Sequence, residues 1–337
     1  MKLDLNQMKK IATGVVNVRE ENGVFYFSRF TSEQEALYLK EKQDYHRKTL
    51  STAGVKLYFK TDSKNLFIKL RTEESTSRKY FSLDVHVNKN PIGHIDNFSD
   101  VELERDYTVQ EFSQGEFSKN FDLGDGEKEV CVHFPWSVKT FIEEVSIDDG
   151  CYVEGIKAEK KLLAFGDSIT HGYDALRPAN RYIVQLADRI GAEEINKGIG
   201  GEMFFPELAD LKEPFVPDYI TVAYGTNDWN CTDCESFRTN CKEFYKNLAN
   251  NYPDSKIFAI TPIWRKDRDE FRKLGAFESV EQYIKEVVSE YKNITFVSGY
   301  DLVPKEENYF SDLYLHPNDD GFAHYVNNLY DKIKNEI

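Results

Sequence analysis

Up to about residue 155, apolar and polar residues alternate with a period of two in several segments. Val55, Leu57 and Phe59 alternate with Lys56, Tyr58 and Lys60 in the first of these segments. Turn-forming runs such as Thr-Asp-Ser and Gly-Asp-Gly separate such segments from one another. Alternation of this kind predicts antiparallel strands with one buried face, and several in series predict a β-sandwich or jelly roll. The remaining segments are 66–70, 81–87, 130–134 and 141–147.

One helix is predicted to interrupt these strands early in the chain. Ser32 can cap it, and Glu35 three residues later completes a capping box. The last alternating segment runs into Asp148-Asp149-Gly150, a turn that suits a domain boundary. We therefore expect a β-sandwich accessory domain over residues 1–155 and a second domain over 156–337.

From Lys160 onward, short apolar segments alternate with segments of helical period. This order predicts a parallel sheet with helices on both faces and right-handed crossovers. The predicted strands are 162–165, 194–196, 219–224, 257–260 and 294–297. The predicted helices are 181–190, 204–211, 234–250, 278–291 and 319–335.

The composition limits the kinds of binding partner that we expect. The chain has 337 residues, of which 40% are hydrophobic, so it can bury a sizeable core. Its formal charge of −15 argues against binding a nucleic-acid backbone or an anionic membrane surface. The first ten residues have no apolar run after their charges, so we expect no signal peptide and a cytoplasmic protein. A homo-oligomer is left open.

The five cysteines favour reduced thiols, because an odd number in a chain of this length does not suit a disulfide framework. Cys231 and Cys234 form a CxxC pair, with Cys241 seven residues further on. No fourth ligand stands at a recognisable zinc spacing. We therefore expect no metal and no cofactor.

Polar residues that could take part in catalysis cluster where the predicted strands of the second half end. Ser168 stands in a Gly-Asp-Ser turn between a buried strand and the next segment. Parallel sheets bind ligands at the carboxyl ends of their strands, which makes Ser168 a candidate nucleophile. The four segments concerned are 166–168, 196–201, 224–228 and 311–318.

In this order, the four segments resemble the SGNH (GDSL-type) hydrolase superfamily of esterases and acyl hydrolases. The resemblance covers residues 160–337 and implies a flavodoxin-like three-layer α/β/α fold. With an N-terminal β-sandwich, the chain also resembles two-domain carbohydrate acetyl esterases.

The resemblance implies a role for each matching residue. Ser168 is then the nucleophile, and His316 is the general base that removes its proton. The backbone N–H groups of Ser168 and Gly201, with the Asn227 side chain, form the oxyanion hole. Glycine suits a main-chain donor because no side chain blocks the acyl oxygen.

The triad acid departs from the family pattern. The family places an aspartate three residues before the histidine, but here Leu313 holds that position and Asp312 stands four residues before His316. A bulge could still bring Asp312 to the imidazole; otherwise a backbone carbonyl or another carboxylate orients the ring. Asp167 is expected to hold the turn of Ser168, and Asp228 to cap a helix.

Several loop residues are expected around the mouth of the site. Aromatic rings beside polar groups suit sugar recognition, although such rings often pack on their own domain instead. The guanidinium of Arg265 can bind a carboxylate or phosphate through two parallel N–H donors. Phe204-Phe205 can line an acyl pocket or begin a core helix. The predicted substrate-binding residues are His171, Tyr173, Trp229, Trp264 and Arg265.

The sequence thus predicts a metal-independent serine esterase that removes short acyl groups, such as acetyl, from a small-molecule or glycan ester. Two alternatives remain: a lipase, lysophospholipase or thioesterase type of acyl hydrolase, and an inactive sugar-binding protein. The four-residue spacing from Asp312 to His316 favours the second alternative.

Overall fold

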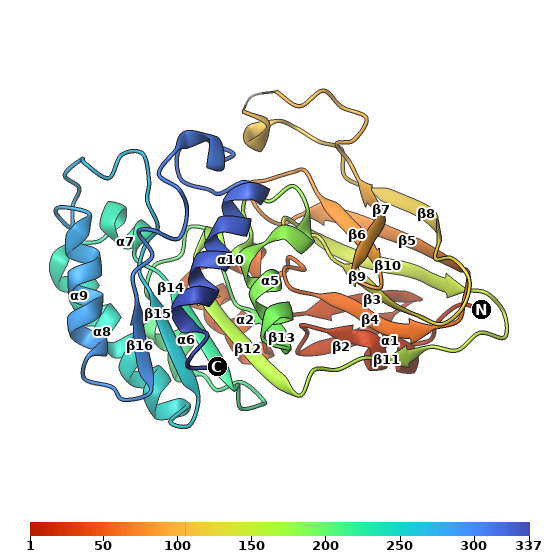
Figure 1. The fold of residues 1–337 in the computed structure, drawn as a ribbon, viewed down its shortest axis with the longest axis horizontal. Helices are drawn as coiled ribbons and strands as arrows, with labels where there is room; N and C mark the ends of the chain where they lie inside the picture. Colours follow the sequence, from red (N-terminus) through yellow and green to blue (C-terminus); the bar gives the residue numbers. More distant parts are fainter. Residues whose placement is uncertain (105) are drawn as a thin grey trace. The chain divides into compact units, whose positions relative to one another are not determined.

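The computed structural model describes residues 1–104 and 106–337. By contacts, the chain divides into two compact units (Figure 1). The first holds Met1–Thr31, Arg47–Ala158 and Leu176–Ala179, and the second holds Ser32–His46, Glu159–Ala175 and Asn180–Ile337. The early segment Ser32–His46 therefore belongs to the second unit. The division into domains at residue 155 stays a prediction.

The first unit contains two antiparallel sheets, which confirms the predicted sandwich architecture. One sheet has the order β1-β4-β9-β6-β7, with β11 beside β4. The other has the order β2-β3-β10-β5-β8. The first sheet comprises β1 (Ala12–Thr13), β4 (Lys56–Thr61), β6 (Ser82–Val87), β7 (Asn90–Asp96), β9 (Lys128–His133) and β11 (Glu154–Gly155). The second comprises β2 (Asn17–Glu21), β3 (Val24–Ser28), β5 (Asn65–Glu74), β8 (Glu116–Asp122) and β10 (Val138–Ile147).

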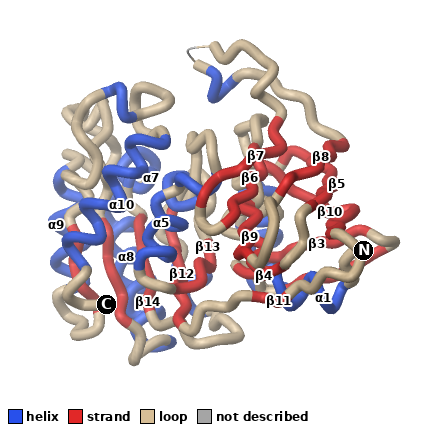
Figure 2. Tube along the Cα trace, turned by 45° about the vertical axis from the view of Figure 1, so that its right-hand side comes forward, coloured by secondary structure: helices blue, strands red, loops and turns tan. Residues whose placement is uncertain are grey.

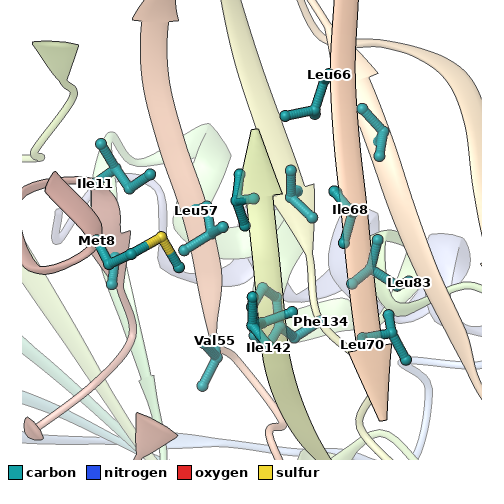
Figure 3. Close-up of a cluster of buried hydrophobic side chains, with 14 of the residues drawn as sticks. Met8, Ile11, Val55, Leu57, Leu66, Ile68, Leu70, Leu83, Phe134 and Ile142 are labelled. Atoms are coloured by element: carbon teal, nitrogen blue, oxygen red, sulfur yellow. The ribbon is translucent and has the colours of Figure 1, made fainter. Parts of the chain in front are cut away.

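Apolar side chains from both sheets form one core in this unit. Leu57 of β4 and Leu83 of β6 share it with Ile68 of β5 and Ile142 of β10 (Figure 3). Each of these side chains is fully buried. The period-two pattern predicted this core because alternate residues of each strand point into it.

Three of the strands that the pattern missed, β2, β7 and β8, have few buried residues. Only Val18 is buried in β2, and only Phe121 in β8. β2, β7 and β8 each lie at the edge of a sheet. A strand with little buried surface has no need of apolar alternation, so its sequence carries no such signal.

The second unit is built on a parallel sheet with the order β13-β12-β14-β15-β16. This is the flavodoxin-like order, in which the first strand, β12, lies between the second and the third, and the chain switches direction between β12 and β14. All four pairings are parallel, which confirms the predicted class. The strands are β12 (Lys160–Gly166), β13 (Ala192–Asn196), β14 (Tyr219–Ala223), β15 (Lys256–Ile260) and β16 (Ile294–Val297).

Helices cover both faces of this sheet. Leu162 and Ala164 of β12 pack in one cluster with Leu186 of α5 and Phe322 of α10. Figures 1 and 2 show α5 and α10 side by side. Phe165 points to the opposite face, where its ring lies 5.7 Å from that of Phe244 of α8. Four helices of this unit are α5 (Tyr182–Arg189), α8 (Cys234–Asn251), α9 (Glu278–Val288) and α10 (Asp319–Ile333).

Most of the remaining helices have seven residues or fewer. The predicted early helix is present as α2, but it begins with Ser32 itself, so the preceding residue takes the cap position and the predicted cap is one residue off. α4 and α7 have only 4 and 6 residues, too few for a helical period to be recognised. The set comprises α1 (Leu5–Ile11), α2 (Ser32–Glu41), α3 (Gln43–Thr49), α4 (Ser168–His171), α6 (Pro206–Asp210), α7 (Thr226–Cys231) and the 3₁₀ turns Tyr107–Val109, Pro178–Asn180 and Glu307–Tyr309.

Candidate active site

Ser168 opens α4 directly after β12. Asp167 is the N-cap of this helix, and its Oδ1 accepts a hydrogen bond from the Ile169 N–H at 3.0 Å. Gly166 has no room for a side chain, because a Cβ there would lie 2.2 Å from Thr170 Oγ1. The turn is therefore specified locally, and Asp167 holds it as expected.

His316 lies in a loop before α10 that Asp312 organises. Asp312 Oδ1 accepts hydrogen bonds from the backbone N–H groups of Tyr314, Leu315 and His316, at 2.9, 2.8 and 3.1 Å. Leu313 adopts a left-handed conformation with φ +56°. The additional residue of this loop is thus absorbed in a tight turn around the aspartate.

The same aspartate reaches the imidazole. Asp312 Oδ2 lies 2.7 Å from His316 Nδ1, and His316 Nε2 lies 2.8 Å from Ser168 Oγ. Burial opposes the charge on Asp312, but hydrogen bonds and charge from His316, with the backbone donors, lower its pKa to about 2. An ionised carboxylate only accepts hydrogen bonds, so Nδ1 donates to it. Nε2 of the neutral ring is then an acceptor for the Ser168 hydroxyl.

The glycine-rich loop after β13 runs along β12 and α4. Ile199 N donates to Gly166 O at 3.0 Å, and Gly200 N donates to His171 Nδ1 at 3.3 Å. A Cβ on Gly198 would lie 2.4 Å from His171 N, so only glycine allows this approach. The loop leads to Gly201, which is exposed and has φ +84°.

Asn227 lies in α7, directly after β14. Its Nδ2 donates to Glu202 O at 3.0 Å, which connects it to the same loop. An amide nitrogen carries two hydrogens, so Asn227 keeps a second donor for a ligand. The segments of Ser168, Gly201 and Asn227 all follow strand carboxyl ends.

Asp228 does not cap a helix, contrary to the prediction. Gly225 occupies the N-cap of α7, and Asp228 lies inside the helix, fully buried. Its Oδ1 accepts from Phe204 N at 3.2 Å. Burial raises its pKa to about 7. Asp228 therefore holds the segment after Gly201 rather than a helix end.

Sequence reasoning missed a contribution from the early helices. The Tyr45 hydroxyl donates to Gly201 O at 2.8 Å. Tyr38 and Tyr224 donate to the two carboxylate oxygens of Glu202, at 2.7 and 2.9 Å. These contacts fix the loop that carries Gly201. No local signal could reveal them, because Tyr38 and Tyr45 lie more than 150 positions earlier in the chain.

His171 and Tyr173 lie beside the predicted triad but are buried. His171 is fully buried and accepts from the Gly200 N–H. The Tyr173 ring lies 5.7 Å from the His316 ring and 5.3 Å from the His171 ring. Both side chains thus support the loops that carry His316 and Gly201, and the structure does not present them as a sugar-stacking surface.

The three other predicted substrate-binding residues are engaged in packing. Trp229 is fully buried, and its Nε1 donates to Gly275 O at 2.8 Å. Trp264 is buried against Phe310. Arg265 is paired with Asp267 at 2.6 Å and also donates to Thr226. Their burial argues against the predicted substrate contacts, since loop position alone cannot distinguish a buried from an exposed ring.

Metal-ligand geometry occurs at one place among residues 1–104 and 106–337. The ligand atoms of Asp174, Asp312 and His316 lie within 4.8 Å of one another. The 2.7 Å contact between His316 and Asp312 has the length of a charge-assisted hydrogen bond, so this group can share a proton. Cys231 and Cys234 are exposed, and Cys241 is buried. In the described part of the chain, no helix is both long and apolar enough to span a bilayer.

Residues 164–324 match the family model described as the GDSL-like Lipase/Acylhydrolase family. This match contains Ser168, Gly201, Asn227, Asp312 and His316. No curated protein sequence matched the chain.

Solved structures share the fold over most of the chain. A salicylyl-acyltransferase, SsfX3, from a tetracycline biosynthetic pathway is 18% identical with a TM-score of 0.79, over 96% of this chain and 94% of its own. A family two carbohydrate esterase from Clostridium thermocellum is 17% identical with a TM-score of 0.61, over 84% and 93%. An acetyl xylan esterase from Butyrivibrio proteoclasticus is 17% identical with a TM-score of 0.58, over 85% and 89%. At these identities, the likeness shows the fold.

Proposed function

We propose that this chain, whose residues 164–324 match the GDSL-like Lipase/Acylhydrolase family model, acts as a carboxylic ester hydrolase that removes short acyl groups from carbohydrate esters through Ser168, His316 and Asp312. One observation carries the proposal. The Ser168 hydroxyl lies 2.8 Å from an imidazole that a carboxylate orients from its other side at 2.7 Å. A serine hydroxyl is a weak nucleophile until a positioned base takes its proton.

The proposed reaction uses these groups in two steps. Ser168 Oγ attacks the ester carbonyl carbon while its proton moves to His316 Nε2. The bond to the leaving alcohol then breaks, and His316 returns the proton to the leaving alkoxide. Water attacks the acyl-enzyme in the same way and restores Ser168. Asp312 stays ionised and stabilises the imidazolium in both steps.

The charge on the tetrahedral intermediate needs preorganised donors. We assign this role to the N–H groups of Ser168 and Gly201 and the free Asn227 hydrogen. The position of Ser168 at the N-terminus of α4 supports its assignment as a donor, because the first N–H groups of a helix have no acceptor within the helix. Tyr45 and Asn227 hold the loop around Gly201, which keeps a donor in place during the reaction.

Two considerations support a short acyl group on a sugar. Phe204 and Phe205, which could have lined an acyl pocket, are buried. Phe204 packs against Tyr224 and Phe244, and Phe205 packs against Tyr38. These two side chains are therefore engaged in packing and do not line a pocket for a long acyl chain. The fold shared with carbohydrate esterases supports a carbohydrate as the part of the substrate that carries the ester.

The test compares wild-type enzyme with Ser168→Ala on acetylated glycans and on nitrophenyl esters of increasing chain length. Acetate release should fall at least about 10³-fold in Ser168→Ala. Ser289→Ala, which changes an exposed serine of the same unit, should retain full activity.

Three other outcomes would each disprove one part of the proposal. Unchanged acetate release by Ser168→Ala would disprove the nucleophile. A strong preference for long acyl chains would replace the acetyl esterase with a lipase type of acyl hydrolase. Binding of glycans without turnover of any ester would identify a sugar-binding protein.

A further inference from the structure

Asp174 places a second carboxylate at the imidazole of His316. Its Oδ2 lies 3.5 Å from His316 Nδ1, the same nitrogen that contacts Asp312 at 2.7 Å. The Asp174 side chain is fully buried. A buried carboxylate is costly unless a positive or hydrogen-bonding group faces it, so this position is not incidental.

The backbone holds Asp174 in this place. Asp174 has φ +71°, a conformation that costs most residues free energy and that aspartate tolerates. Its carbonyl oxygen accepts a hydrogen bond from Ser311 Oγ at 2.9 Å. Ser311 directly precedes Asp312, so this bond ties the loop after α4 to the loop that carries His316.

We propose that Asp174 is a positioning residue that acts through His316, sharing with Asp312 the stabilisation of the imidazolium formed at each proton transfer. This inference rests on the proposed function. Asp312, at hydrogen-bond distance, accepts the hydrogen bond from Nδ1–H and fixes the ring. Asp174 adds a second negative charge on the same side and limits rotation of the ring away from Ser168. It also takes over the Nδ1 proton when Asp312 is removed.

The charged groups that the described contacts place near His316 are negative. Asp167 faces it from the turn between β12 and α4, close enough for the two charges to interact. The Tyr173 ring packs beside the imidazole. Arg265, whose charge acts on Asp167, is bound to Asp267. Negative neighbours favour the charged form of histidine, so His316 should be a stronger base than with Asp312 alone.

The experiment uses full-length Asp174→Asn, Asp312→Asn and the double variant. Asparagine preserves shape and tolerates the left-handed backbone. kcat/KM for nitrophenyl acetate is measured across the pH range. Asp174→Asn should shift the acidic limb to lower pH by about 0.5–1 unit, because the imidazolium loses a stabilising charge. It should reduce the plateau by about 3–10-fold, with kcat rather than KM changing.

The double variant separates positioning from simple packing. Asp312→Asn should retain residual activity through Asp174, so adding Asp174→Asn should cost at least about 10-fold more in that background than in wild type. Asp254→Asn, an exposed aspartate of the same unit, should leave rate and pH profile unchanged. Equal effects of Asp174→Asn in both backgrounds, or an unshifted acidic limb, would overturn the proposal.

A measurement that needs no turnover distinguishes this inference from the proposed function. In Ser168→Ala protein, the His316 ring is titrated by NMR with and without Asp174→Asn. Loss of Asp174 should lower the measured pKa of His316. If Ser168→Ala abolishes hydrolysis but this pKa does not move, the esterase stands and the role of Asp174 fails. If Ser168→Ala remains active while the pKa of His316 moves, the assignment of Ser168 as nucleophile fails and the interaction of Asp174 with His316 stands.

Discussion

Asp167 and Asp312 each hold a turn that carries a side chain of the proposed triad, Ser168 in one case and His316 in the other. Both aspartates use Oδ1 to bind backbone N–H groups of the turn that follows. Asp167 binds one such group, at Ile169, and is completely buried. Asp312 binds three and also the imidazole of His316.

This difference moves the two pKa values in opposite directions. Burial raises the pKa of Asp167 to about 6, although Ile169 and His316 oppose it. Burial also acts on Asp312, but its hydrogen bonds and the charge of His316 lower the pKa to about 2. The number of donors around a carboxylate thus decides whether burial neutralises it. Of the two, only Asp312 is ionised throughout the neutral range, as the acid of the proposed triad must be.

The largest effect in this comparison is expected from Asp312→Ala, which removes both the turn and the partner of His316. Activity should fall by about 10²–10⁴-fold. Unfolding free energy should fall by about 2–3 kcal/mol at neutral pH, measured by urea denaturation.

The loss of stability in Asp312→Ala should also depend on pH. Since the folded pKa of Asp312 is lowered, its stabilisation is present above about pH 4 and lost as pH falls through about 2. Wild-type and variant curves should therefore converge in acid. A constant difference across this range would contradict an ionised Asp312.

Asp167→Asn should change the unfolding free energy in the opposite direction. The folded pKa of Asp167 is raised to about 6, so ionising it costs the folded state free energy as pH rises. Asparagine keeps the acceptor for Ile169 without the charge. The variant should be more stable than wild type above about pH 6, by up to about 3 kcal/mol, and equally stable below about pH 4. Thermal unfolding at the two pH values tests this, and an equal shift at both would disprove it.

Leu313→Gly should have the smallest effect. Glycine adopts φ +56° freely, but it gains entropy in the unfolded chain and loses the leucine side chain. We expect the unfolding free energy to change by less than about 1 kcal/mol, with activity retained. Leu313→Val, with a β-branched side chain, should be the less stable variant of the pair. Equal stability of both would show that the left-handed turn is relaxed in solution.

Much of the second unit was predictable because its signals are local. The apolar runs marked all five parallel strands, and the segments after them marked Ser168, Gly201, Asn227 and His316. A buried strand needs apolar residues on both faces, and a ligand edge needs glycine and polar residues just beyond it. The substrate contacts could not be predicted in this way. Trp229, Trp264 and Arg265 follow the correct strands, yet each is buried in its own unit.

By itself, the sequence determined the β-sandwich followed by a parallel α/β sheet, the Gly-Asp-Ser turn and the types of residue in the proposed triad. Tertiary structure alone decided that Asp312 reaches His316 across a longer turn, that Asp174 faces the same nitrogen, and that Tyr45 holds Gly201. The reason is physical. Hydrophobic period and turn chemistry act between neighbours along the chain, whereas a hydrogen bond or an ion pair depends on distances that only the packed fold sets.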